Sequence, residues 1–353
     1  MIPPWGDMPK ITRREVVLSR YVRRVRYTSW RWYWGMRSRR YYPSLLPTSN
    51  PITFDRAKEE ALAALDELLE AEREPQNAAL VDHYSSEQWR LERPLVQRYV
   101  QRALDPSFRR STVLGRQMVT VTPGPPHVDR YCEYLLAHDD WLAERLRRGP
   151  LESRIGRPYL QHVVGGTMYS ANTIEHLYYL ARLMRNTKAE LPSSVIELGG
   201  GFGNLARLVQ ELAPHTTYID IDYPETLALA HVNLRLNFSD LPIVVHKTHV
   251  DSIVPGAVNL VPVWLAQDVR FRPDLFLSTF ALSETSDAMR ELCARVAFFG
   301  CSRIYVLGSV DEVFKSAAQI QAATTSLYGA DSLHQSIKPY VYEVIGTRQP
   351  SAP

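Results

Sequence analysis

The sequence has few cysteines and no long apolar run. Three cysteines occur among 353 residues, which is too few and too irregularly spaced for a disulfide framework or a zinc site. No apolar stretch reaches the roughly 18 to 20 residues that a membrane-spanning helix needs. The first residues also lack the apolar core and small-residue cleavage site of a secretory signal. We therefore expect a cytoplasmic protein without a transmembrane segment, in which the cysteines are buried as small apolar residues.

Acidic residues are scarce in one early segment. Residues 10–40 hold eleven Lys or Arg against one acid, Glu15, whereas the whole chain has a net charge of only +3. Trp30, Trp32 and Trp34 alternate with other residues there, and a period of two argues against a helix. A basic, aromatic arm can bind an anionic ligand or pack on a second subunit. We assign residues 1–50 to such an arm, which makes a homo-oligomer formed through the N-terminal region one expectation.

The following segment, residues 51–186, has the pattern of a mainly helical N-terminal domain or cap. Apolar residues recur at helical spacing over 54–72, 85–104 and 127–148. Ser170 can cap a further helix that runs to about residue 185. The Pro-rich stretch 122–127 predicts a turn between helices.

From Ser193 onward, short apolar runs alternate with helical stretches. The expected helices span 203–213, 224–237, 285–299 and 311–328, and the expected strands contain SVIEL, TTYIDID, PIVVH, VNLVPVWL, DLFLSTF, RIYVLGS and PYVYEVIGT. This alternation indicates an α/β fold with a doubly wound, Rossmann-like sheet, which we assign to residues 187–353. Two runs, PIVVH and VNLVPVWL, compete for the place of the third strand, and both remain open.

A glycine-rich turn follows the first of these strands, in the stretch SSVIELGGGFGNLARLVQ. Such a turn places backbone N–H groups and a helix N-terminus beside a ligand. The dinucleotide fingerprint G-x-G-x-x-G fails because Asn occupies position 204, and the Walker pattern fails because no Lys-Ser or Lys-Thr follows. What remains is an acid, Glu197, followed by glycines at alternate positions 199, 201 and 203.

A second acid lies where the next strand ends. Asp222 follows Gly203 by nineteen residues and closes the run TTYIDID. An acid at this position of an α/β sheet can accept both hydrogen bonds of a ribose diol. Asp220 lies two residues earlier, on the same face, and can share this role.

The segments VIELGGGFGNLARLVQELAP, YIDIDYPETLALAHVNL and DLFLSTFALSET together resemble the bacterial sugar O-methyltransferase family, whose members carry E-x-G-G-G-x-G and D-x-P-E-T motifs. The resemblance spans residues 160–346 and departs from the family pattern at Thr285, where Met is typical. It implies a Rossmann-like methyltransferase fold and S-adenosylmethionine as the cofactor. The cofactor contacts that it implies are Glu197, Gly199, Gly200, Gly201, Gly203, Asn204, Asp222, Tyr223 and Thr279.

Methyl transfer to a sugar hydroxyl benefits from a base that accepts the hydroxyl proton. The resemblance places the turn 278–284 near the methyl group, so Glu284 is one catalytic candidate. His176 is the other, because an unperturbed imidazole has a pKa near 6.5. Weaker candidates for a site are His162, His246 and His249, while Tyr169 and Asn172 are candidates for the cofactor carboxylate or the acceptor.

Two further features of a site stay open or are not expected. Asp251 and Gln267 are alternative contacts for adenine, depending on which run forms the third strand. The stretch HKTHVD at 246–251 contains metal-ligand residue types, but its spacing matches no known signature, so we expect no metal.

The sequence thus predicts an O-methyltransferase that acts on a hydroxyl of a saccharide or a glycosylated metabolite. A natural-product O-methyltransferase with another small-molecule acceptor is the nearest alternative. A nucleic-acid methyltransferase could use the basic arm, but STFALSE stands where amino-directed enzymes of that group resemble one another in a D/N-P-P-Y/F motif. A non-catalytic assembly protein of the same fold is the remaining alternative, and the intact acids and glycines argue against it.

Overall fold

The computed structural model describes residues 50–117, 126–138, 142, 144–146, 149–188, 190–250, 252–309, 316–329, 333–335 and 341–348. The basic arm, most of the Pro-rich stretch and Asp251 lie outside these residues. In the described part of the chain, no helix is both long enough and apolar enough to cross a membrane.

Helices make up the first part of the described chain. They are α2 (Phe54–Glu72), α3 (Pro75–Tyr84), α4 (Glu87–Ala103), η3 (Phe108–Arg110), α5 (Leu114–Gln117) and α6 (Pro126–His138). The helices expected over 54–72 and 85–104 are present, and Thr53 and Ser86 cap them with their side-chain oxygens. Helix α3 was not expected, because only Val81 and Tyr84 of its ten residues are buried and the sequence therefore shows little helical periodicity.

A hairpin precedes the long helix that Ser170 begins. Strands β1 (His162–Val164) and β2 (Thr167–Tyr169) pair antiparallel. Gly165 and Gly166 form their two-residue connection with φ values of +56° and +82°, the backbone that favours glycine in such turns. The hairpin was not expected, since three-residue strands are too short to show alternation. The expected cap at Ser170 is confirmed, because its side chain accepts from the Thr173 N–H at the start of α8 (Ala171–Thr187).

The second half of the chain alternates strands with helices around one sheet. Its strands are β3 (Ser194–Leu198), β4 (Thr217–Asp222), β5 (Ile243–Val245), β6 (Val258–Pro262), β7 (Leu275–Thr279), β8 (Arg303–Ser309), β9 (Leu333–Gln335) and β10 (Val341–Thr347). Its helices are α9 (Asn204–Leu212), α10 (Pro224–Asn237), η4 (Val263–Asp268), α11 (Ala281–Glu284), α12 (Asp287–Arg295), η5 (Phe298–Gly300) and α13 (Ser316–Tyr328).

Among the described residues the strand order is β5-β6-β4-β3-β7-β8-β10-β9. The pairs from β5 to β8 are parallel, whereas β10 is antiparallel to both β8 and β9. Without β5 and β10, this is the order of doubly wound dinucleotide-binding sheets, with the switch point between β3 and β7. The expected α/β, doubly wound Rossmann-like fold is therefore confirmed, and the ligand is expected at the carboxyl ends of β3, β4 and β7.

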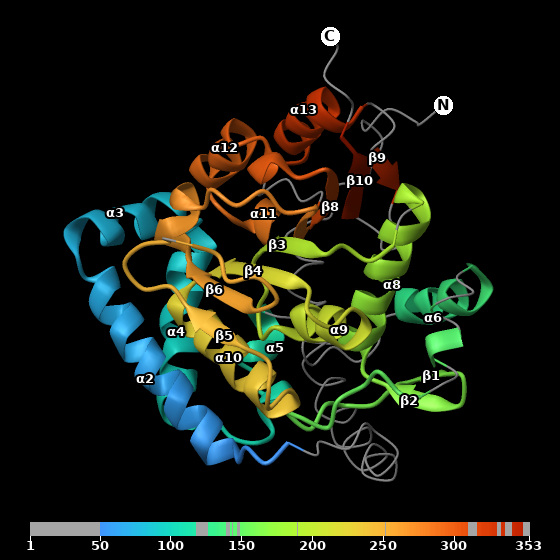
Figure 1. Ribbon diagram of the computed structural model, residues 1–353, viewed down its shortest axis with the longest axis horizontal. Coiled ribbons are helices and arrows are strands. Elements are labelled where there is room, and N and C mark those ends of the chain that lie inside the picture. Colours follow the sequence, from blue (N-terminus) through green and yellow to red (C-terminus); the bar gives the residue numbers. More distant parts are fainter. Residues whose placement is uncertain are drawn as a thin grey trace, which may run out of the picture.

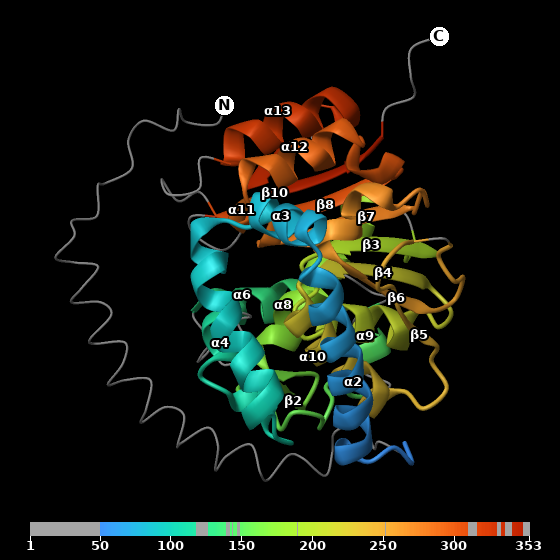
Figure 2. The same ribbon diagram turned by 90° about the vertical axis from the view of Figure 1, so that its left-hand side faces the viewer.

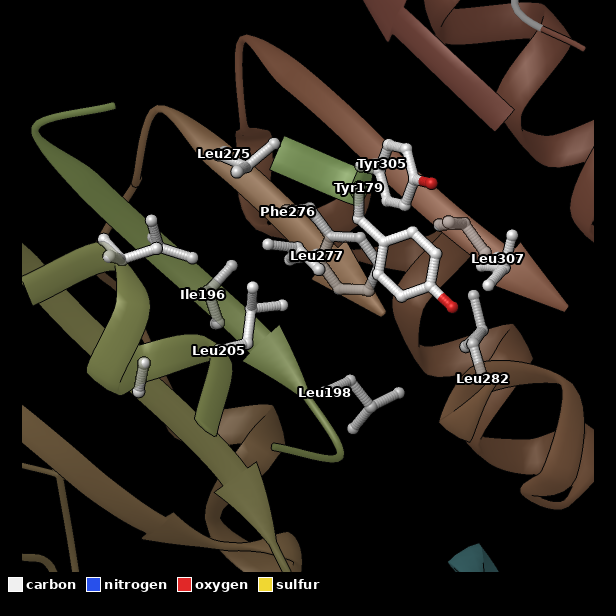
Figure 3. Packing of buried hydrophobic residues seen from close by; sticks show 14 of the residues in the cluster. Tyr179, Ile196, Leu198, Leu205, Leu275, Phe276, Leu277, Leu282, Tyr305 and Leu307 are labelled. Atoms are coloured by element: carbon white, nitrogen blue, oxygen red, sulfur yellow. The ribbon is translucent and has the colours of Figure 1, made fainter. Parts of the chain in front are cut away.

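Helices cover both faces of the sheet (Figure 1). The register pairs Leu277 of β7 with Tyr305 of β8, so these two side chains lie on one face of the sheet. Phe276, the neighbour of Leu277 along β7, points to the opposite face. The Tyr179 ring of α8 lies 5.7 Å from that of Tyr305, and the Phe298 ring of η5 lies 5.2 Å from that of Phe276. Figure 3 shows Tyr179, Phe276 and Tyr305 among the buried residues that gather around β3, β7 and β8. The core thus fixes the strand ends that carry the candidate site.

The N-terminal helices pack directly on the sheet's own helices (Figure 2). One apolar cluster joins residues of α2 and α4 with Leu229 and Val232 of α10 and with Phe202 from the glycine turn. A second cluster joins α6 and α8 to the strands. Packing is thus continuous across residues 186 and 187, where we expected a domain boundary, and the division into domains stays a prediction.

Three expected elements differ from the structure. The run VNLVPVWL forms strand β6 only as far as Pro262, after which η4 begins, and the run PIVVH forms the edge strand β5. The third strand, next to β4, is therefore β6. The single helix expected over 285–299 is two elements, α12 and η5, because Ala297, Phe298 and Phe299 have positive φ values that end the helix. The segment that holds Glu284 is the short helix α11 rather than a turn.

Candidate functional site

The glycine turn is packed against the protein itself. A Cβ atom at Gly199 would lie 2.1 Å from Cβ of Ala281, and one at Gly203 would lie 3.1 Å from Cβ of Ala230. A Cβ at Gly200 would lie 2.5 Å from the carboxylate oxygens of Asp220. The φ values at Gly199, Gly201 and Gly203 are +83°, +61° and +73°, which glycine adopts without the strain that a side chain would add. Three of the four glycines therefore have a reason in the chain's own packing, where the sequence suggested only an approaching ligand.

Two aspartates of β4 hold this turn. The N–H of Gly200 donates to Asp220 Oδ1 and the N–H of Gly201 donates to Asp222 Oδ2, each over 3.1 Å. Asp222 Oδ1 accepts from the N–H of Tyr223 over 2.7 Å. Because a carboxylate oxygen can accept two hydrogen bonds, each oxygen of Asp222 keeps capacity for one ligand hydroxyl. The structure brings the predicted Gly201 and Asp222 together.

Four polar side chains form a buried row at this end of the sheet. Tyr218, Asp220 and Asp222 alternate along β4, and Glu197 pairs in register with Asp220, so all four share one face. The Tyr218 hydroxyl donates to Glu197 Oε2 over 2.6 Å. Asp220 is 1% exposed, and its Oδ2 has no hydrogen-bond partner among the described residues. An orphaned buried acceptor beside a ligand turn indicates that a ligand or an ordered water completes the site.

Burial also changes the titration of these acids. Loss of hydration raises the pKa of Glu197 and of Asp222 to about 7, and it raises the pKa of Asp220 well above its usual range, with repulsion from Asp222 and Glu197 adding to the effect. The carboxyl groups are therefore partly protonated near neutral pH. A hydrogen-bond donor of a bound ligand favours their ionised form and so displaces these protons.

Replacing Asp220 with Asn tests this pKa shift. A raised pKa means that the folded state holds a proton that the unfolded chain has released above pH 3.8. The contribution of Asp220 to stability therefore falls as pH rises above 3.8, by up to about 1.4 kcal/mol per pH unit until the carboxyl ionises in the folded state. Asp220→Asn keeps an acceptor for Gly200 but does not titrate, so its stability relative to wild type should rise with pH. Urea unfolding at pH 5, 6, 7 and 8 measures the difference, and parallel curves would contradict it.

The elbow between α3 and α4 covers the end of β4. Ser85 Oγ lies 2.9 Å from the Tyr223 hydroxyl, the Trp89 ring lies 5.7 Å from the Tyr223 ring, and the Arg93 guanidinium lies 4.5 Å above it. Arg93 also pairs with Glu225, at 2.8 Å and 3.2 Å. The side chain of Tyr223 thus faces the elbow, and only its backbone N–H contacts the Asp222 carboxylate.

Glu284 lies where β7 ends. Thr279 is the last residue of β7, Phe280 follows with φ of +75°, and α11 begins at once. The Phe280 carbonyl accepts from the N–H of Glu284 over 3.1 Å, and Glu284 is partly buried at the end of that turn. Because Ala281 touches Gly199, α11 lies against the glycine turn.

His176 is joined to the glycine turn through Asn204. Asn204 Nδ2 donates to Asn172 Oδ1 over 2.8 Å and lies 3.3 Å from His176 Nδ1, while Asn204 Oδ1 accepts from Arg207 Nε over 3.0 Å. Both ends of the Asn204 amide are therefore engaged within the protein, where we had expected a cofactor contact. Burial lowers the pKa of His176 to about 4, below the 6.5 of an unperturbed imidazole, which makes the ring a weaker base.

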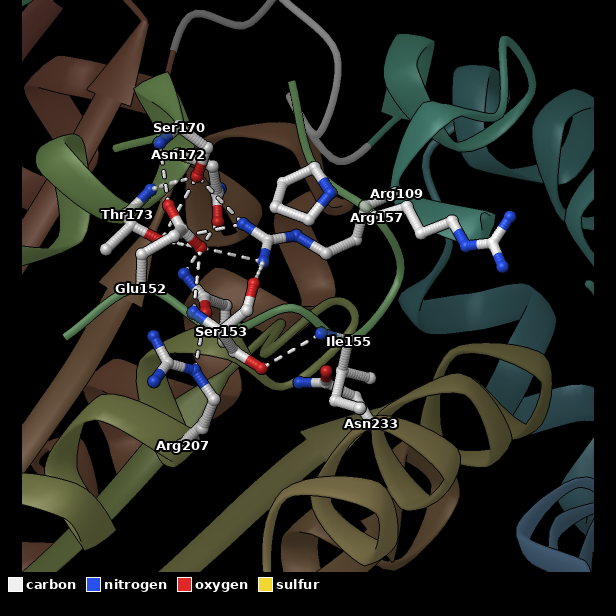
Figure 4. A network of polar contacts seen from close by, with 12 residues as sticks. Arg109, Glu152, Ser153, Ile155, Arg157, Ser170, Asn172, Thr173, Arg207 and Asn233 are labelled. Carbon is white, nitrogen blue, oxygen red and sulfur yellow. Dashed lines mark hydrogen bonds and ion pairs between the residues drawn. The ribbon is translucent and has the colours of Figure 1, made fainter. Parts of the chain in front are cut away.

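A buried ionic network lies behind the turn (Figure 4). Arg109 Nη1 pairs with Glu152 Oε1 over 2.9 Å, and Nη2 donates to Ser170 Oγ over 2.8 Å. Glu152 Oε2 accepts from the N–H of Ser170, and its Oε1 accepts from Thr173 Oγ1. The Arg109 guanidinium lies 5.3 Å from the Phe202 ring of the glycine turn. Sequence reasoning missed this pair, because an isolated Arg and Glu 43 positions apart carry no pattern.

The remaining candidates lie elsewhere. His246 Nε2 lies 3.2 Å from Asn259 Oδ1, which ties β5 to β6, and the Tyr169 hydroxyl accepts from the N–H of Leu151 over 3.3 Å. His162 lies in β1, with Nδ1 3.1 Å from Asp129 Oδ1, and Gln267 lies in η4, after the third strand. Across the described ranges, no group of three His, Cys, Asp or Glu residues has an arrangement suited to a metal ion.

No protein-family model and no curated protein sequence matches the chain. Distant likenesses exist among solved structures. The CurJ carbon methyltransferase has a TM-score of 0.36 at 11% identity, over 84% of this chain and 92% of that one. An rRNA methylase from Escherichia coli has 0.34 at 16% identity, over 77% and 100%. An O-methyltransferase family 2 protein from Planctomyces limnophilus, in complex with apigenin, has 0.31 at 15% identity, over 87% and 100%. At this distance no conclusion about ligand or reaction follows from them.

Proposed function

We propose that the chain is an S-adenosylmethionine-dependent methyltransferase that methylates a hydroxyl of a sugar or glycosylated metabolite. The observation that carries this proposal is the hydrogen bond of 3.1 Å between Gly201 N–H and Asp222 Oδ2, which joins the turn after β3 to the acid after β4. These strand ends flank the switch point of a doubly wound sheet, where such folds bind nucleotide-like ligands.

The residues present fit this cofactor. Asp222 can accept hydrogen bonds from a ribose diol, because each of its oxygens holds only one backbone N–H. The orphaned Oδ2 of Asp220 can form a further hydrogen bond with a ligand. Glu197 lies in the same row, and the backbone of the turn borders it. Gln267 in η4, after the third strand, is the described candidate for the adenine contact.

When bound, S-adenosylmethionine supplies an electrophilic methyl group on its sulfonium. The chain then has to hold the acceptor hydroxyl in line with that methyl and remove the hydroxyl proton. We assign proton removal to Glu284, at the end of α11 beside the glycine turn, in preference to His176, whose two ring nitrogens lie against the Asn172 and Asn204 amides. Thr279 is the last residue of β7, two positions before α11 begins.

Replacing Asp222 with Ala tests the cofactor assignment. Loss of hydrogen bonds from a charged acceptor should weaken S-adenosylmethionine binding by about 1.5–3 kcal/mol. Isothermal titration calorimetry measures the dissociation constant. The matched control is Asp274→Ala: Asp274 accepts from the Ser193 and Ser194 N–H groups at the opposite end of the sheet, so its loss should lower stability but leave binding unchanged. Equal affinity in wild type and Asp222→Ala would overturn the assignment.

The acceptor class follows from the resemblance of the three motifs. We propose a saccharide or small-molecule acceptor rather than a nucleic acid, and an N-terminal arm that contacts the acceptor or a second subunit. Assay of methyl transfer to neutral sugars, glycosylated metabolites and single-stranded DNA separates the acceptors. Methylation of DNA alone would contradict the proposal.

A further inference from the structure

One buried arginine of α9 lacks the partner that its surroundings call for. Arg207 is 1% exposed, and its Nη2 has no hydrogen-bond partner among the described residues. Its side-chain hydrogen bond runs from Nε to Asn204 Oδ1. Burial lowers its pKa to about 10, so the guanidinium is still charged at neutral pH. A charged donor that is buried without a partner is costly, which points to a group that completes it.

The nearby charges do not neutralise this guanidinium. Glu152 is the acid with the largest effect on it, but that carboxylate already pairs with Arg109 over 2.9 Å and accepts from Ser170 and Thr173. Arg109 itself repels Arg207. Glu211, the next acid, pairs with Arg145 over 3.3 Å. Two guanidinium groups therefore share the charge of one carboxylate, and the excess charge in the network is positive.

This excess charge lies beside the proposed cofactor site. Arg207 is one turn into α9, which begins at Asn204 directly after the glycine turn. Its partner Asn204 contacts Asn172 and His176 near the start of α8. The N-termini of two helices, of 9 and 17 residues, thus meet at this network, and their dipoles also favour negative charge.

We propose that Arg207 binds a ligand carboxylate at the junction of α8, α9 and the glycine turn. The inference rests on the function proposed above. Two ligands can supply this group: the methionine end of S-adenosylmethionine, or an acceptor that carries an acid, such as a sugar acid. In either case the carboxylate gives the orphaned Nη2 a charge-assisted hydrogen bond and neutralises the excess positive charge.

Paired ligands that differ only in the carboxylate, or mainly in it, test the proposal. Calorimetry compares S-adenosylmethionine with its decarboxylated form, and ligand-observed NMR compares D-glucuronate with D-glucose. Wild type should favour the carboxylate member of one pair by about tenfold or more, and Arg207→Met should reduce that preference to within about twofold. Arg207→Lys retains the charge and should keep part of the preference, which covers the case that the Met variant fails to fold.

Arg182→Met is the matched control. Arg182 also belongs to a helix on the sheet, but it is paired with Glu343 over 3.1 Å, so its loss should lower stability and leave both preferences intact. Loss of preference in the cofactor pair identifies the methionine carboxylate, and loss in the sugar pair identifies an acidic acceptor. Preferences that are absent in wild type, or unchanged in both Arg207 variants, overturn the inference. If wild type binds neither nucleoside ligand, the proposed function fails, and the sugar pair alone decides the role of Arg207.

Discussion

Replacing Glu152 with Ala is expected to lower the free energy of unfolding by about 3–5 kcal/mol. Glu152 is fully buried and is the ion-pair partner of the buried Arg109. Without it, the guanidinium stays in the protein interior with no counter-charge, and Ser170 and Thr173 lose their acceptor as well. The cost arises from the charge that is left behind, so the substitution should act on stability before it acts on chemistry.

Urea unfolding followed by circular dichroism measures this loss. Glu211→Ala is the matched control, because the Glu211 pair with Arg145 is about a quarter exposed on both sides, and such pairs contribute at most about 1 kcal/mol. The double variant Arg109→Met with Glu152→Met removes both charges and should be more stable than Glu152→Ala alone. A loss in Glu152→Ala no larger than in Glu211→Ala would show that the pair does not hold the network.

Replacing Glu284 with Gln is expected to lower turnover by about 100-fold or more, because a positioned base contributes roughly that factor. Gln has nearly the same size, and α11 is held by its backbone and by Ser283 Oγ, which donates to the Phe280 carbonyl. Cofactor affinity should therefore stay within about twofold, so that the loss falls on kcat rather than on binding. Steady-state kinetics with a verified acceptor, alongside calorimetry, separates the two.

Two controls accompany this variant. Glu291→Gln changes an exposed residue of α12 and should leave turnover unchanged. His176→Gln removes the alternative base, whose two ring nitrogens lie against the Asn172 and Asn204 amides, and should lower turnover only a few-fold. If Glu284→Gln and His176→Gln both keep turnover within a few-fold of wild type, neither residue is the base. A large loss in His176→Gln alone would transfer the role to the histidine.

Local sequence patterns predicted most strands of the sheet, and they also predicted the glycine turn and the acid that lies beside it. Alternating apolar runs located the strands from β3 to β10 except the short β9, and the spacing from Gly203 to Asp222 placed an acid at the right strand end. These signals are short-range, since each depends on the periodicity of one strand or helix. The third strand could not be chosen in this way, because β5 and β6 are both apolar and only their order in the sheet distinguishes them.

Contacts between segments that are distant along the chain could not be predicted from the sequence. Ser85 and Arg93 of the N-terminal helices fix Tyr223 across more than a hundred positions, and no periodicity reports such pairing. The lowered pKa of His176 was not predictable for the same reason, because the desolvation that causes it comes from tertiary packing. Glu152 and Arg109 form a pair only because the segment before the hairpin packs on η3, where the Arg109 N–H donates to the Gly156 carbonyl.

The packing of the glycines affects why their motif is conserved among related proteins. Gly199, Gly200 and Gly203 each fit against a neighbouring part of the same chain, at Ala281, Asp220 and Ala230. A descendant that had lost its ligand would still need all three to fold, so selection for folding alone would preserve the glycines. The Arg207 guanidinium has no such protection, since its orphaned Nη2 is a burden on an unliganded protein. Among relatives of this chain, retention of that arginine should therefore distinguish proteins that still bind the ligand from those that have lost it better than the glycine motif does.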